Sequence, residues 1–134
     1  MNQLLQEALL STHHVQHAAI IKRKDGSIKA KSPLFEITPM DYTKILIAFE
    51  SPRDVRTGEA AITLMDMAYR AVRADNLSLY AKNDKSGIIV AKTHGHYIVS
   101  TYDGTMFASV CAEAVEKLGM FSTSQKILLT NTRK

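Results

Sequence analysis

Five histidines are the residues of this chain whose type and spacing come closest to a metal site. His13 and His17 have the i, i+4 spacing of paired zinc ligands on a helix. The second position of that motif holds His14 where the chemistry needs a glutamate base, and no third ligand is identifiable. His94 and His96 flank the tip of a predicted hairpin, and two ligands alone do not make a structural zinc site. We therefore predict no metal and no cofactor.

The single cysteine, Cys111, is the only thiol that could act as a nucleophile. It lies on the apolar stripe of a predicted helix, where a cysteine usually behaves as a small buried hydrophobe. No nucleophile elbow, phosphate-binding glycine loop or paired-carboxylate pattern is present. The sequence therefore predicts a protein that is not an enzyme.

Positive charge is the stronger functional signal. The chain has 17 Lys and Arg against 13 Asp and Glu, which leaves a net charge of +4. Such clusters attract phosphates on nucleic acids, inositol lipids or acidic partners, although they can also be a solubilising surface. We expect these side chains to be solvent-exposed, because turns and strand ends normally are. The cluster comprises Lys22, Arg23, Lys24, Lys29 and Lys31 around the single acid Asp25, and the tail adds Lys126, Arg133 and Lys134.

Length and composition indicate one globular domain over residues 1–134. Apolar residues make up 46% of the chain, and only 6 Gly and 3 Pro are present, which argues against disorder and fibrous repeats. The apolar runs are too short to span a bilayer, and the first residues lack the features of a signal peptide. A lone cysteine cannot form an internal disulfide, so we expect a cytoplasmic location.

Three helices are predicted from apolar periodicity and capping residues. An amphipathic helix covers Met1–Leu10. A second begins after Thr38, with Pro39 at its first position, and ends at about Glu50 before Ser51-Pro52. A third follows Gly104, and Gly119 fits its C-cap; its predicted buried stripe is Phe107, Val110, Cys111, Ala114, Val115 and Leu118.

Short β-rich runs fill most of the remaining chain. An Asp-Gly pair at Asp25-Gly26 predicts a tight hairpin turn between the first two strands. The later strands are joined by brief turns, which requires antiparallel pairing, and the whole order is typical of an α+β fold. The predicted strands are Val15–Lys22, Ile28–Lys31, Ala60–Leu64, Met67–Ala74, Leu77–Ala81, Gly87–Thr93 and His96–Tyr102.

Several motifs in this order resemble the profilin family over nearly the whole chain. They include Ala18–Ile21 before Asp25-Gly26-Ser27, and Ile37-Thr38-Pro39 opening a helix. The stretches Val72–Asp75 and Ser78–Asn83 look most like the divergent testis-type, fourth branch of that family. The resemblance implies a central antiparallel sheet of six or seven strands, with the N- and C-terminal helices on one face and a further helix on the other.

The resemblance also implies three binding activities, carried over position by position. For monomeric actin the candidates are Arg73, Lys82, Lys85 and Glu113, with weak or atypical binding expected because Asp103–Ala108 replaces the family's glycine-rich turn. For poly-L-proline they are Leu4, Leu5, Lys29 and Phe121, and the absence of tryptophan predicts impaired binding. For acidic phosphoinositides they are Lys22, Arg23, Lys24, Lys29, Lys31 and Lys126, with Lys82 and Lys85 adding charge.

The functional hypothesis is a non-enzymatic, cytoskeleton-associated regulator that binds phosphoinositides at the membrane surface. One alternative is an ordinary profilin that binds both actin monomers and proline-rich partners. The other is a basic nucleic-acid or phosphate-binding module, which would present an open basic and aromatic sheet face. We expect no nucleic-acid partner, because no aromatic residue is interleaved with the basic cluster at Lys22–Lys31.

Overall fold

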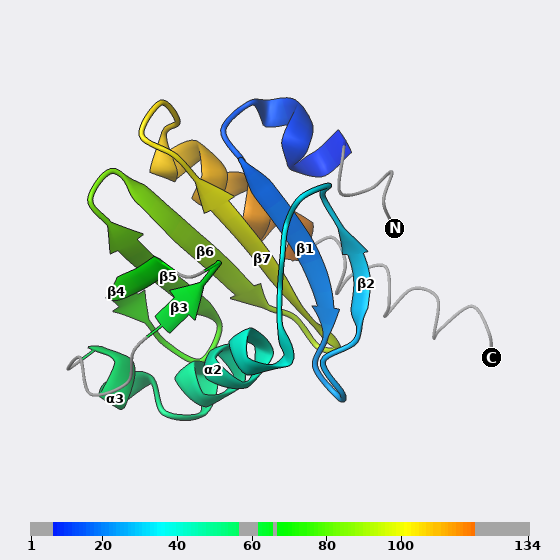
Figure 1. The fold of residues 1–134 in the computed structure, drawn as a ribbon, viewed down its shortest axis with the longest axis vertical. Helices are drawn as coiled ribbons and strands as arrows, with labels where there is room; N and C mark the ends of the chain where they lie inside the picture. Colours follow the sequence, from blue (N-terminus) through cyan, green and yellow to red (C-terminus); the bar gives the residue numbers. More distant parts are fainter. Residues whose placement is uncertain (1–6, 57–61, 66, 120–134) are drawn as a thin grey trace.

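Seven antiparallel strands form one sheet in the order β2-β1-β7-β6-β5-β4-β3 (Figure 1). The structure is a computed structural model that describes residues 7–56, 62–65 and 67–119. The seven-stranded antiparallel sheet confirms the fold predicted from the sequence. The strands are β1 (His17–Lys22), β2 (Ile28–Lys31), β3 (Ile62–Leu64), β4 (Met67–Ala74), β5 (Ser78–Asn83), β6 (Ser86–Lys92) and β7 (His96–Tyr102).

Helix α2 (Pro39–Glu50) begins and ends where the sequence predicted. The Thr38 hydroxyl accepts a hydrogen bond from the Asp41 amide at 3.2 Å, and the Asp41 carboxylate accepts one from the Thr38 amide at 2.9 Å. This capping box satisfies amide donors that the first turn would otherwise leave unpaired. Helix α3 (Pro52–Arg56) was not predicted, because a proline that stops one helix also suits the first position of the next.

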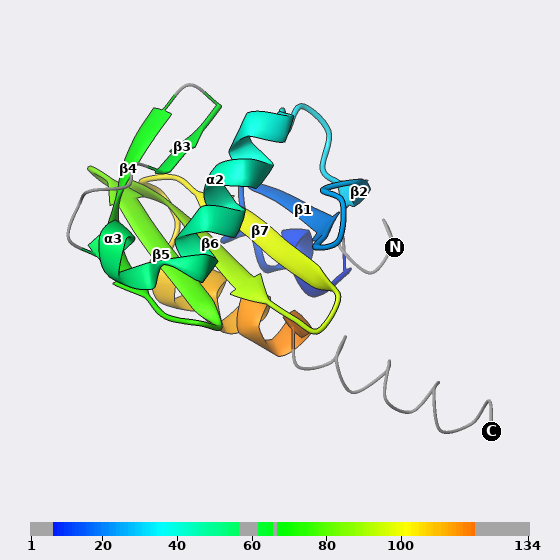
Figure 2. The ribbon, with the colours of Figure 1, turned by 90° about the horizontal axis from the view of Figure 1, so that it is seen from below.

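The sheet separates two hydrophobic cores (Figure 2). On one face, Ile45, Phe49 and Val55 of α2 and α3 pack against the sheet. On the other face, Leu9 and Val115 belong to the second core, so the described N-terminal segment and the helix over residues 108–119 share that face. Helices therefore lie over both faces of the central strands, and the open sheet face expected of a nucleic-acid module is not present in the described part of the chain.

Turns at opposite ends of the strands carry the exposed charges. In the β1–β2 turn Gly26 has a φ of +79°, and an added Cβ would meet the Tyr42 ring at 2.7 Å, so the turn needs glycine for both reasons. The Asp25 carboxylate accepts a hydrogen bond from the Ser27 amide at 2.9 Å. The β5–β6 turn is shorter than predicted, because Asn83 and Ser86 are paired in the sheet.

Two details of the terminal helices differ from the prediction. Phe107 is 68% exposed, because it precedes the helix over residues 108–119 and stacks on His14 instead of facing the core. Gly119 is still helical and has no positive φ, so it is not the predicted C-cap. Residues 7 and 8 are helical and are followed by the short helix η1 (Leu10–Thr12), while Leu4 and Leu5 lie outside the described residues.

No helix within the described ranges is long and apolar enough to cross a membrane.

Candidate binding surfaces

Arg73 stands at the centre of the surface that the resemblance assigns to actin. It lies on β4 opposite Tyr80 of β5, and its guanidinium carbon is 5.2 Å from the centre of the Tyr80 ring. The Tyr80 hydroxyl donates a hydrogen bond of 2.5 Å to Glu116 on the helix over residues 108–119. A cation, an aromatic ring and a carboxylate thus connect two strands to that helix. Sequence reasoning missed this group of three residues. The strand register is needed to show that Arg73 and Tyr80 are neighbours, and Glu116 is 36 positions from Tyr80 in the sequence.

Asp75 holds Arg73 in place from the same strand end. The Arg73 Nε atom donates to the Asp75 carboxylate at 3.0 Å, and this contact raises the pKa of Arg73. The Asp75 carboxylate also accepts hydrogen bonds from the amides of Leu77 and Ser78, at 2.9 and 2.8 Å. The Leu77 amide is the main cause of the lowered pKa of Asp75, and Arg73 contributes further. Burial first, and then the hydrogen bond to Glu116, raises the pKa of Tyr80 to about 12.

The other three actin candidates lie on β5, in the β5–β6 turn and on the helix over residues 108–119. Lys82 is exposed on β5, opposite Arg70 of β4. Lys85 is exposed in the β5–β6 turn, and the turn that contains Gly104 packs against its side chain. Glu113 is exposed on the helix and forms an ion pair of 3.4 Å with Lys117.

The β1–β2 hairpin carries the exposed part of the basic cluster. Lys24 in the turn and Lys29 on β2 are both exposed, while Lys22 is half-buried. The Lys31 ammonium donates to the backbone carbonyl of Phe35 at 3.1 Å. Lys126, the tail candidate, lies outside the described residues. Lys24 and Lys29 are therefore the lysines of this corner whose exposed side chains point to a role in binding an outside ligand.

Arg23 is half-buried, which corrects the expectation that the whole cluster is solvent-exposed. Its Nη1 atom donates to the backbone carbonyls of Thr93 and His94, both at 2.9 Å. Its guanidinium carbon also lies 5.9 Å from the centre of the Tyr97 ring. These contacts tie the β1–β2 turn to the β6–β7 turn, so replacement of Arg23 by glutamate would disturb the fold as well as the charge.

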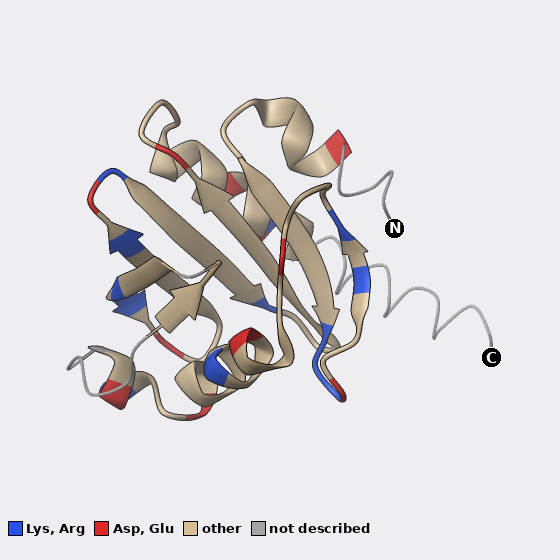
Figure 3. Ribbon diagram, in the orientation of Figure 1, with Lys and Arg blue, Asp and Glu red and all other residues tan. Residues whose placement is uncertain are grey.

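The two basic hairpins do not form one surface (Figure 3). Lys22 pairs with His96 at the start of β7, whereas Gly87, just after the β5–β6 turn, pairs with Tyr102 at the end of β7. The two turns therefore lie at opposite ends of the strands, and strands β7 and β6 lie between β1 and β5. Lys82, which pairs with Arg70 and Gly87, lies near the same end of the sheet as Lys85, and both are far from Lys24 and Lys29.

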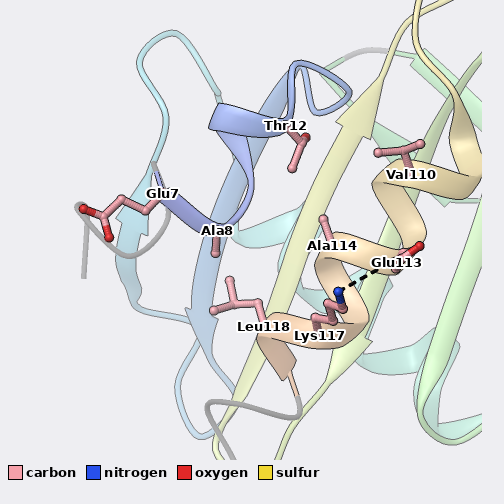
Figure 4. A pocket seen from close by; sticks show the side chains of 8 residues that line it. All are labelled: Glu7, Ala8, Thr12, Val110, Glu113, Ala114, Lys117 and Leu118. Carbon is pink, nitrogen blue, oxygen red and sulfur yellow. Dashed lines mark ion pairs between the residues drawn. The ribbon is translucent and has the colours of Figure 1, made fainter.

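An apolar groove of about 500 Å³ lies between the N-terminal segment and the helix over residues 108–119 (Figure 4). Ala8 and Leu118 line it from the two sides, and Glu113 and Lys117 stand at its border. Leu4, Leu5 and Phe121, the poly-proline candidates on the terminal segments, lie outside the described residues, and Lys29 is exposed on β2.

His13, His17 and Cys111, the residues whose type suggested chemistry, occupy separate places in the fold. His13 follows η1 with a φ of 64°, whereas His17 is in β1, so the two do not share a helix face. Cys111 is fully buried, its Sγ atom lies 3.3 Å from the Ser100 hydroxyl, and burial raises the pKa of its thiol. Among the described residues no three His, Cys, Asp or Glu side chains are grouped so that they could hold a metal ion.

Comparison with known proteins identifies the family. The profilin family model matches residues 1–126. Profilin-4 of Bos taurus is 41% identical over 119 residues, which are 89% of this chain and 92% of that protein. The structure of Acanthamoeba castellanii profilin IB is 31% identical with a TM-score of 0.85, and the match covers 94% of this chain and 99% of that one. The complex of LokiProfilin1 with rabbit actin shares the fold at 14% identity, with a TM-score of 0.76 over 92% of this chain and 93% of that one. On this sequence and structural similarity, the chain belongs to the profilin family.

Proposed function

We propose that this protein is a non-enzymatic, cytoplasmic regulator of the actin cytoskeleton that binds acidic phosphoinositides through its β1–β2 hairpin. The observation that carries the proposal is the exposure of Lys24 and Lys29 at one corner of the sheet. A basic residue close to an anionic leaflet contributes about 1 kcal/mol of attraction. Lys22 and Lys31 stand in the same hairpin, so several charges can act together and recruitment is reversible.

Arg23 supports this role by holding the corner rather than by contacting lipid. Its hydrogen bonds to the β6–β7 turn fix the position of the turn that carries Lys24. A fixed turn loses less conformational entropy when it binds a headgroup than a mobile one does.

Actin binding is weak or atypical in this proposal. LokiProfilin1 has been solved with rabbit actin, and family membership extends that partner class to this chain. Arg73 already forms an ion pair with Asp75, and this ion pair would have to break before Arg73 could bind a partner. Charged groups with an internal partner contribute less to a new interface, because the existing interaction must be broken first.

Ordinary profilin activity is the second candidate. The groove between the N-terminal segment and the helix over residues 108–119 favours it, because this groove is apolar and large enough to hold a peptide side chain. The absence of tryptophan argues for impaired poly-L-proline binding, since proline-rich ligands dock on aromatic surfaces.

The lipid proposal is tested by co-sedimentation with phosphatidylcholine vesicles that contain phosphatidylinositol 4,5-bisphosphate. The variant Lys24→Glu/Lys29→Glu should lose recruitment, and Lys82→Glu/Lys85→Glu is its matched control at the opposite end of the sheet. Arg23 is kept, so the fold is not disturbed. Equal loss in both variants would mean that net charge alone drives binding, and no loss in the first would mean that the hairpin is not the lipid site.

Actin binding is tested with fluorescently labelled actin monomers, with Acanthamoeba castellanii profilin IB and Schizosaccharomyces pombe profilin measured beside this protein. We expect clearly weaker binding by this chain. Binding as tight as that of the two relatives, together with saturable binding of an oligoproline peptide, would favour the ordinary-profilin alternative.

A further inference from the structure

A cleft of about 400 Å³ lies between the start of α2 and the hairpin of β3 and β4. Figure 2 shows that hairpin beside α2, on the face of the sheet opposite the helix over residues 108–119. The Lys44 ammonium donates to the Thr63 hydroxyl at 2.6 Å and holds β3 against α2. The cleft is therefore separate from the groove between the terminal segments.

Methionines form the apolar part of this cleft. Met40 is 62% exposed at the start of α2, and Met65 is 41% exposed in the β3–β4 turn. Ala68 of β4 adds a smaller apolar contact to the same lining. Exposed methionines are flexible and polarisable, and they adapt to apolar side chains of different shapes.

Among the described residues, the charged side chains that line the cleft are Glu36 and Asp41, and both are acidic. Glu36 is exposed, and Asp41 is buried with one carboxylate oxygen bound to the Thr38 amide. This local charge is opposite in sign to the net charge of +4 on the chain. Lys44 keeps its positive charge when it donates to the neutral Thr63 hydroxyl, so the two carboxylates outnumber one cation beside the cleft. An anionic lipid or phosphate would be repelled here, whereas a cation beside an apolar group would be attracted.

We propose that this cleft docks an amphipathic segment of a partner protein, with an apolar side chain among Met40 and Met65 and a lysine or arginine against Glu36. The partner chemistry is thus basic and apolar, the opposite of what the β1–β2 hairpin attracts. A protein with both surfaces can hold a partner on one face while the sheet corner contacts an acidic membrane. The cleft proposal does not depend on lipid or actin binding.

The test is a titration of the protein, labelled with ¹³C at its methionine methyl groups, with a helical model peptide of leucine and lysine. The chain has 6 methionines, and Met106, packed against the core on the other face, is the internal reference. We expect the Met40 and Met65 signals to shift and the Met106 signal to stay. A peptide of the same pattern with glutamate in place of lysine should not shift them.

Two charge variants separate the cleft from general electrostatics. Glu36→Lys should weaken binding of the leucine–lysine peptide about fivefold, as expected for one partly exposed ion pair. Glu50→Lys makes the same charge change at the far end of α2, outside the cleft lining, and should leave the affinity unchanged. The proposal is wrong if neither peptide binds, if both bind equally, if Glu36→Lys has no effect, or if Met106 responds with the others. Shifts of Met40 and Met65 that follow protein concentration without peptide would assign the cleft to a second copy of this chain and overturn the proposal.

Discussion

At the scale of single residues, Asp75 shows how one carboxylate organises a binding surface. It accepts hydrogen bonds from two backbone amides in the β4–β5 turn and from the Arg73 guanidinium. All three bonds favour the ionised form, which is why the pKa of Asp75 is lowered. Arg73 also lies against the Tyr80 ring, so the position of this candidate actin residue depends on Asp75 in the neighbouring turn.

We predict that Asp75→Ala lowers the free energy of unfolding by about 1 kcal/mol at neutral pH, since it leaves two turn amides unpaired. The folded pKa is below the unfolded one, so this stabilisation is present above the unfolded value and is lost as pH falls through the folded value. The difference between wild type and variant, measured by urea denaturation, should therefore shrink in acid. Asp75→Asn keeps a neutral hydrogen-bond acceptor, so its free energy of unfolding should fall by less than that of Asp75→Ala. An equal, pH-independent fall in both variants would contradict this account.

At the scale of elements, local sequence determines α2 almost alone. We predict that Thr38→Ala, which removes the side-chain cap, lowers the free energy of unfolding by about 1 kcal/mol. Thr43→Ala is the matched control, because its exposed hydroxyl only bonds back to the Pro39 carbonyl at 3.0 Å and the change should stay within about 0.5 kcal/mol. Thermal or urea unfolding of the two variants measures this, and equal losses would show that the cap is not what defines the helix start.

Elements whose limits depend on neighbouring residues could be predicted from the sequence, and contacts between distant residues could not. Apolar runs and turn residues located the strands, and Thr38, Pro39 and Pro52 located the limits of α2. Helical spacing placed Phe107 on a buried stripe, but its stacking on His14 depends on a residue 93 positions away. The role of Arg23 was missed for the same reason, because its carbonyl partners belong to the β6–β7 turn.

At the scale of the whole molecule, the sheet keeps different surfaces apart. Lys85 in the β5–β6 turn and the β1–β2 hairpin lie at opposite ends of the strands, and the cleft lined by Met40 and Met65 lies on the face opposite the groove between the terminal segments. The net charge of +4 is therefore not spread evenly: the exposed basic hairpins are separated, and the cleft is lined by acids. A change of salt concentration should therefore change binding at the basic hairpin and binding at the acidic cleft to different extents.

Salt should distinguish the charged corner from the fold that carries it. The screening length falls from about 10 Å at 0.1 M salt to about 3 Å at 1 M, so we predict that recruitment to phosphoinositide vesicles falls steeply over this range. The fold should not change, because it rests on two buried cores, and the two ion pairs that the described residues show have exposed side chains. Vesicle co-sedimentation gives the first quantity, and urea denaturation at the same salt concentrations gives the second. Recruitment that persists at 1 M salt would mean that apolar contact, rather than the lysines of the β1–β2 hairpin, holds the protein at the membrane.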